Sequence, residues 1–142
     1  MKDNNNNTIL FYKTQYSFLV IFGVLFCEAV FLAILYGDLE NIFLWILATA
    51  FAVVALLYYR LDIILDHETL TISKGIGLIS DEYPLPLLQS VVTQPNNNLF
   101  DWIYDPFSAE CLGVKFRDGT IITIAIPERA QLQQLLRMKI NA

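Results

Sequence analysis

Few residues of the types that support catalysis stand near one another in this chain. The single histidine, His67, lies beside Glu68 in a predicted polar turn, where a solvated side chain is the simplest interpretation. Cys111 opens a predicted strand with no histidine near it in sequence, so we interpret it as a small core residue. We therefore predict no catalytic residue and no enzyme activity; an enzyme using Cys111 or His67 would reveal itself by thiol reactivity or a bound metal.

The sequence gives equally little support for a metal site or a phosphate-binding site. Acidic residues occur in two pairs, Asp81 with Glu82 and Asp101 with Asp105, but neither pair is accompanied by the histidines or further carboxylates that metal sites use. The glycines Gly75 and Gly77 do not form a phosphate-binding loop. We expect no metal and no cofactor.

One acid, Glu28, stands in the middle of a long apolar run, where an ionised carboxylate inside a bilayer costs roughly 2.5–3.5 kcal/mol. Folding the chain back about Leu39 brings Glu28 to the depth of Thr49, so a protonated Glu28 can bond Thr49 or a backbone carbonyl. Alternatively, Glu28 faces another subunit or a partner's membrane span. A proton or ion path is the least supported reading, because the apolar runs contain no second ionisable group.

The segment 96–107 carries more large apolar side chains than an ordinary solvated loop. Tryptophan and tyrosine favour contact surfaces, so we predict a partner-binding surface that comprises Leu99, Phe100, Trp102, Tyr104 and Phe107. Two alternatives remain open. The side chains could fold back over an open end of the β-domain, or they could dock on a membrane surface, which Asp101 and Asp105 would oppose at an anionic leaflet.

Two apolar runs, 16–36 and 42–59, precede these residues, and a short polar turn separates them. The chain of 142 residues is 56% hydrophobic and only 16% charged, which is more apolar surface than a small soluble domain can bury. Each run is about 20 residues and about 30 Å long as a helix, which matches the hydrocarbon thickness. We predict a transmembrane helical hairpin over 14–60; two buried helices of a soluble bundle are the alternative.

The basic residues nearest the runs are Lys2 and Lys13 before the first and Arg60 after the second. The turn between the runs has no basic residue, and its charged residues are the acids Asp38 and Glu40. Positive residues mark the cytoplasmic side, so both termini are expected in the cytoplasm of a multi-pass protein. The asparagine-rich start, 1–13, is predicted to be a polar disordered tail.

After Arg60 the sequence pattern changes from helix to sheet. Short β-rich runs are predicted at 61–65, 69–73, 78–83, 90–94, 111–116 and 120–126. Pro84 and Pro86 predict a turn or short helix between two of these strands, and Asp118 with Gly119 signals a hairpin. A C-terminal helix is expected from Pro127, with leucines at helical spacing. The expected fold is thus α+β, with antiparallel strands and one closing helix.

Four segments carry a resemblance to a known group, namely 70–75, 83–91, 108–114 and 127–136. The chain resembles small bacterial membrane proteins in which a pleckstrin-homology-like (PH-like) domain follows two transmembrane helices. The resemblance covers about 61–140, so the third domain is expected to be a cytoplasmic PH-like β-domain over 61–142. It implies a bacterial inner-membrane protein and a scaffold that binds proteins, peptides or lipids.

The charge balance narrows the ligand classes. The net charge is −5, which disfavours nucleic acid. The loop around Lys74 has no cluster of cations, so a phosphoinositide headgroup is disfavoured. We expect a membrane-anchored binding or assembly module that contacts the lipid bilayer and a protein or peptide partner, or another copy of itself. The alternative is a small accessory or regulatory subunit of a membrane transport or secretion complex, with the hairpin packed against partner spans.

Overall fold

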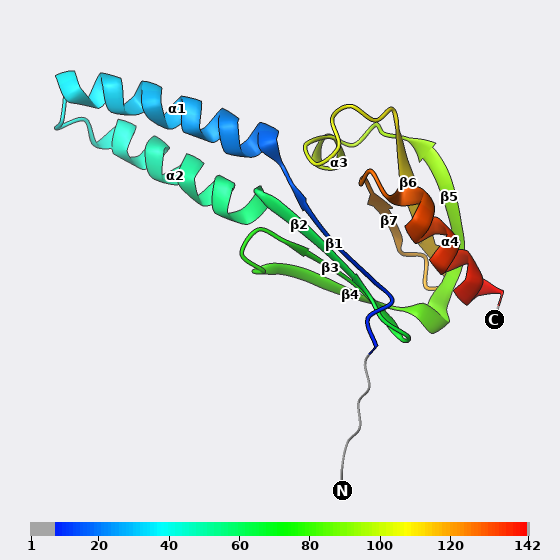
Figure 1. The fold of residues 1–142 in the computed structure, drawn as a ribbon. Helices are drawn as coiled ribbons and strands as arrows, with labels where there is room; N and C mark the ends of the chain where they lie inside the picture. Colours follow the sequence, from blue (N-terminus) through cyan, green and yellow to red (C-terminus); the bar gives the residue numbers. More distant parts are fainter. Residues whose placement is uncertain (1–7, 142) are drawn as a thin grey trace, which may run out of the picture.

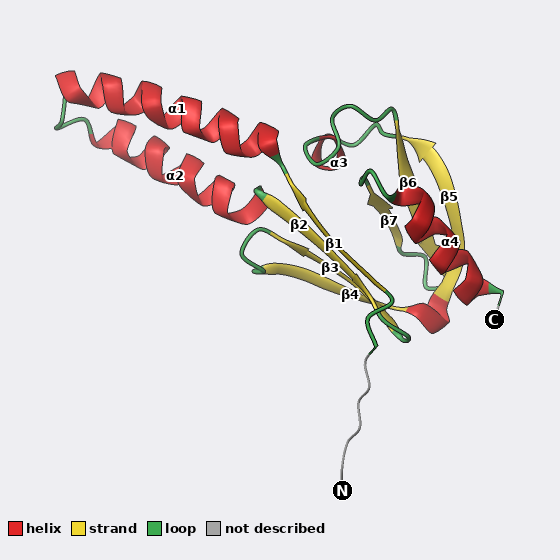
Figure 2. Ribbon diagram, viewed as in Figure 1, coloured by secondary structure: helices red, strands yellow, loops and turns green. Residues whose placement is uncertain are grey.

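The structure, a computed structural model, describes residues 8–141, apart from the side chain of Phe100. It is an α+β fold with two antiparallel sheets (Figures 1 and 2). The elements in chain order are β1 (Phe11–Tyr16), α1 (Phe18–Gly37), α2 (Ile42–Tyr58), β2 (Arg60–Leu65), β3 (Thr69–Lys74), β4 (Ile79–Pro84), η1 (Leu85–Leu87), β5 (Leu88–Pro95), α3 (Leu99–Trp102), β6 (Glu110–Phe116), β7 (Ile121–Ile124) and α4 (Arg129–Ile140).

The first sheet has the order β1-β2-β3-β4, and β1, one of its two edge strands, precedes the long helices in the sequence. β1 pairs with β2 from Phe11 opposite Leu65 to Tyr16 opposite Arg60. The expected boundaries were therefore wrong for 11–16, which belong to the sheet rather than to a tail or a hairpin. The physical reason is that β1 pairs with β2, which follows both helices in the sequence. A pairing between strands so distant in sequence leaves no local pattern. The rest of the expected tail, 1–7, lies outside the described residues.

The helices α1 and α2 run antiparallel and project from the end of the sheet (Figure 1). Ser17 caps α1 by accepting from the Val20 amide, and Asn41 caps α2 by accepting from the Leu44 amide. Of the described helices, α1 alone has both the length and the apolar composition to cross a membrane. α2 is equally apolar but shorter, at 17 residues.

The second sheet has the order β5-β6-β7, and α4 packs against it (Figure 2). The expected strands are present here, and the predicted short helix is η1, which joins the two sheets. Leu132 and Leu136 of α4 are fully buried because their helical spacing places them on the face toward the sheet.

The main core lies between the two sheets and under α4. Its largest fully buried side chains outside the long helices come from β2, β3, β6, β7, α4 and the segments beside them, and include Ile63, Leu70, Leu112, Phe116, Ile126 and Leu132. The rings of Phe116 and Tyr83 stack with centroids 5.3 Å apart, so aromatic packing joins the two sheets.

Candidate functional site

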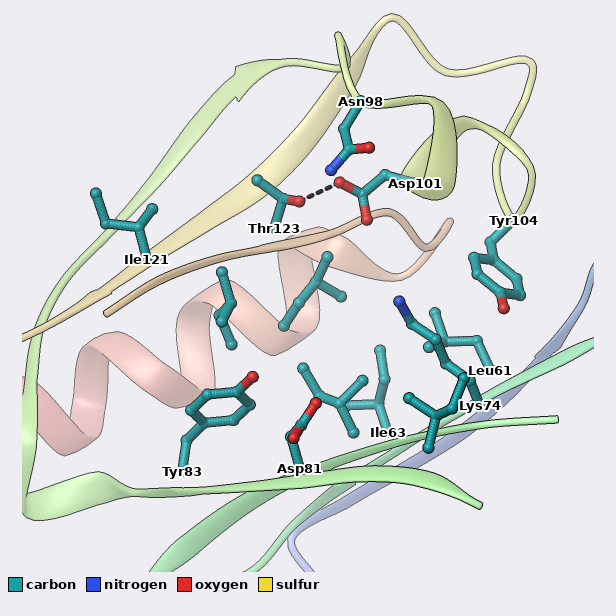
Figure 3. Close-up of a pocket in the computed structure, with 14 residues that line it drawn as sticks. Leu61, Ile63, Lys74, Asp81, Tyr83, Asn98, Asp101, Tyr104, Ile121 and Thr123 are labelled. Carbon is teal, nitrogen blue, oxygen red and sulfur yellow. Dashed lines mark hydrogen bonds between the residues drawn. The ribbon is translucent and has the colours of Figure 1, made fainter. Parts of the chain in front are cut away.

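A cleft opens between the two sheets, with a volume of about 260 Å³ (Figure 3). Its floor is formed by β2 and β3, one side by β4, and the other side by β7 and the loop that contains α3. The lining side chains are mostly isoleucine, leucine and tyrosine, with a few polar groups among them. Polar groups come from Lys74, Asp81, Asn98, Asp101 and Thr123, so the cleft offers hydrogen-bonding and charged groups as well as apolar side chains to a ligand.

Both sides of this cleft are edges of sheets. β4 ends the first sheet and β7 ends the second, and no described strand pairs with either on the outer side. β7 lines the cleft with all four of its residues, whereas β4 does so with alternate residues, Ile79, Asp81 and Tyr83. Since side chains alternate along a strand, four consecutive lining residues mean that the edge of β7, and not only one face, borders the cleft. Such an edge offers backbone groups to an added strand.

Polar groups gather at the end of the cleft nearest α3 (Figure 3). Asp101 accepts a hydrogen bond from the Thr123 hydroxyl, which fixes α3 against β7. The hydroxyl of Tyr104 is buried and has no hydrogen-bond partner among the described residues. Burial raises the pKa of Tyr104, with smaller contributions from Tyr58 and Asp101, so the phenol is neutral and able to donate. Lys74, at the end of β3, reaches into the cleft from its floor.

Burial also raises the pKa of Asp101, although the bond from Thr123 and the charge of Lys74 act in the other direction. The folded protein therefore keeps this proton at pH values where the unfolded chain, with a pKa of about 3.9, has lost it. The stability that this group contributes is complete below the pKa of the unfolded chain and is lost as the pH rises through the folded pKa.

We expect Asp101→Asn to reduce the loss of stability as the pH rises above about 4, because the amide has no proton to lose. The measurement is the melting temperature of wild type and variant at increasing pH. Asp105, whose pKa burial also raises, provides the comparison through Asp105→Asn. Parallel pH profiles for Asp101→Asn and wild type would contradict the assignment.

The predicted partner-binding residues divide between core and surface. Tyr104 is buried and contributes to the core, and the neighbouring Ile103 packs against it. Leu99 is exposed next to the cleft, Trp102 is 40% exposed, and Phe107 is fully exposed. The side chain of Phe100 lies outside the described part of the chain. The segment thus covers part of the core and also presents apolar surface.

Two hydrogen bonds fasten this segment to the junction between β1 and α1. The Ser17 hydroxyl donates to the Ile103 carbonyl over 2.5 Å, and the Gln15 side chain donates to the Tyr104 carbonyl over 3.1 Å. Phe107 borders a hollow that is also lined by Phe18 and Leu19, in the first turn of α1. The aromatic segment therefore lies beside the base of the long helices.

The structure does not join Glu28 to Thr49. The Thr49 hydroxyl donates to the Trp45 carbonyl one turn earlier in α2. A buried carboxyl oxygen of Glu28 has no hydrogen-bond partner among the described residues, and it borders an apolar groove that Ala52 and Ala55 also line. The expected bond within the helix pair is therefore absent from the described contacts.

The remaining candidates for chemistry stay apart. Cys111 is buried, burial raises the pKa of its thiol, and its sulfur lies 3.7 Å from the Pro95 carbonyl oxygen. His67 is exposed next to the Lys139 side chain. Within residues 8–141, no three histidine, cysteine or acidic side chains come close enough to hold a metal ion.

Sequence reasoning missed the contributions of Lys74, Thr123 and Ile121 to the cleft. In the sequence these three residues have the pattern of ordinary strand residues. Their place in the cleft depends on which strands lie at the edges of the sheets, which the local sequence does not indicate. Only the polar Thr123 in an otherwise isoleucine-rich strand was a signal that could have been noticed. Comparison with known protein families, characterised proteins and solved structures finds no match to this chain.

Proposed function

We propose that this chain is a membrane-anchored binding module, in which α1 and α2 both cross a bacterial inner membrane and a PH-like domain binds a protein partner at the cytoplasmic face. The observation that carries the binding role is the cleft between the edges of β4 and β7. A PH-like assignment is supported by the element order, four strands and then three strands followed by a helix that packs on the second sheet.

Exposure of the long helices supports the membrane anchor. Phe22, Phe26 and Phe43 are each more than 60% exposed, and the buried residues of the two helices are only Leu35 and Ala48. Water would face a continuous apolar surface far larger than monomeric soluble proteins expose. Helix α2, at about 26 Å, is slightly shorter than the hydrocarbon layer, which its flanking aromatic residues and local bilayer thinning can accommodate.

The ends of the hairpin support the orientation. Arg60 stands at its base, opposite Tyr16, and Lys13 lies three residues before Tyr16 in β1, whereas Asp38 and Glu40 stand at its tip. The rings of Tyr16 and Tyr59 lie 6.4 Å apart at the base, at the level where aromatic side chains meet lipid headgroups. Positive residues at the base then place the β-domain and both termini in the cytoplasm.

The cleft suits an extended peptide segment of the partner. Such a segment would pair with the open edge of β7 and place alternate apolar side chains among the isoleucines of β3 and β7. The Tyr104 hydroxyl would donate to a peptide carbonyl, which satisfies a buried group that lacks a partner among the described residues. Lys74 on the floor and Asp81 on the β4 side would select charged or polar side chains of the segment.

A pull-down from mild detergent with mass spectrometry tests this role. Ile121→Lys places a charge at an exposed position of β7, and Val92→Lys makes the same change at an exposed position of β5 that is outside the cleft. We expect Ile121→Lys to lose a partner that Val92→Lys retains. Tyr104→Phe should weaken capture by about 2- to 10-fold, the effect of one hydrogen bond. Equal capture by wild type and Ile121→Lys would refute the cleft as the site.

A second candidate function rests on Glu28. Glu28 lines a groove together with Ala52 and Ala55, where another helix can approach closely, and one buried oxygen of its carboxyl group has no partner among the described residues. The chain would then be an accessory or regulatory subunit of a membrane transport or secretion complex, held by its helices. In the same pull-down, capture lost with Glu28→Leu but retained with Ile121→Lys would favour this function over the first.

A further inference from the structure

Two exposed apolar segments flank the base of the helix pair, one beside each helix. On the α1 side, Phe107 is fully exposed next to Phe18 and Leu19. On the α2 side, the turn between β3 and β4 presents Ile76, 53% exposed, and Leu78, 75% exposed. We call Phe107, Ile76 and Leu78 the apolar collar.

Hydrogen bonds hold the segments that carry the collar at the level of the helix ends. The Ile76 amide donates to the Leu56 carbonyl of α2 over 3.1 Å, and the Gly75 amide donates to the Arg60 carbonyl over 2.7 Å. On the other side, the bond from Ser17 to the Ile103 carbonyl ties the aromatic segment to the first residue before α1. The collar is therefore built into the fold at a fixed depth relative to α1 and α2.

The charges near the collar do not oppose contact with lipid. The segments 75–80 and 106–109 contain no charged residue. Asp101 is buried and bonded to Thr123, and Asp105 is partly buried with the charge of Arg129 nearby, so both carboxyl groups that would repel an anionic leaflet are turned inward.

We propose that the apolar collar inserts into the interfacial layer of the bilayer and fixes the orientation of the β-domain on the membrane. The inference rests on the membrane anchor of the proposed function and adds a lipid-binding surface to it. Recognition is by burial of apolar side chains among the lipid headgroups rather than by attraction of a basic site to one headgroup. Contacts of this kind on both sides of the helix pair restrict tilting of the domain relative to the membrane plane.

Fluorescence quenching in vesicles tests the collar. The full chain is reconstituted into phosphatidylcholine vesicles whose acyl chains carry bromine near the carbonyl end, so that only tryptophans at the interface lose emission. Trp102→Phe leaves Trp45, in α2, as the reporter of the anchor. In the background lacking both native tryptophans, Phe107→Trp and Leu78→Trp report on the two sides of the collar. Met138→Trp, at an exposed position of α4, is the matched control.

We expect quenching and a blue shift of emission for Trp45, Phe107→Trp and Leu78→Trp, and neither for Met138→Trp. Quenching of Trp45 without quenching at Phe107→Trp or at Leu78→Trp would refute the insertion of the collar but would support the membrane anchor. Phe107 would then be assigned to contact with a protein partner. An unquenched Trp45 would instead refute the anchor itself. Quenching at all four positions would also overturn the collar, because the contact would not be confined to it.

Discussion

Gly75→Ala is expected to lower the free energy of unfolding by roughly 3–5 kcal/mol, from a left-handed backbone and a steric clash together. Gly75 has φ +60°, and a Cβ built there would lie 2.1 Å from the Leu56 carbonyl oxygen and 2.6 Å from two backbone atoms of Leu57. Backbone of α2 cannot yield as a flexible side chain does. The turn between β3 and β4 would have to move away from the helix end.

Gly77→Ala is the matched control for this variant. Gly77 also has positive φ, +92°, but a Cβ there meets nothing within 4 Å. Gly77→Ala should lower the free energy of unfolding by only about 1–2 kcal/mol, the cost of a left-handed backbone without a steric clash. Chemical or thermal unfolding of the purified protein in detergent measures both variants. Equal losses would show that the close approach to α2 contributes nothing.

Phe116→Ala is expected to destabilise the protein by about 3–5 kcal/mol, the usual cost of removing a large aromatic side chain from a core. Phe116 is 1% exposed and stacks on Tyr83, so its removal leaves a cavity at the contact between the two sheets. The same unfolding measurement in detergent tests this prediction.

Phe107→Ala makes the same chemical change at a fully exposed position. It should alter the unfolding free energy in detergent by no more than about 0.5 kcal/mol, as surface substitutions usually do. A large loss with Phe107→Ala would mean that the aromatic segment supports the core, which would remove the basis for a lipid-binding collar.

The strands from β2 to β7 could be predicted because each carries its own local signals. Pro84 and Pro86 indicated the break at η1, and Asp118 with Gly119 indicated the turn between β6 and β7. β1 could not be predicted in this way. Its alternating pattern is short and leads into an apolar helix, and its partner β2 follows only after the whole of α1 and α2.

The candidate site was predictable only in composition. An excess of aromatic residues in 96–107 indicated a special segment, but composition does not tell that Tyr104 turns into the core while Phe107 points outward. Prediction of the cleft would require knowing which strands end the two sheets. That depends on long-range pairing, to which residues such as Ile121 contribute no distinctive local pattern.

The placement of both long helices between the paired strands β1 and β2 has a consequence for the order of folding. During synthesis β1 leaves the ribosome first, yet its only neighbour in the sheet, β2, is made after both helices. In the proposed topology, β1 stays unpaired in the cytoplasm until both helices have crossed the membrane. Only then does β2 emerge on the same side as β1. Completion of the sheet then depends on membrane insertion of both helices. If α2 does not cross back to the cytoplasmic side, β1 and β2 lie on opposite sides of the membrane and the sheet cannot form.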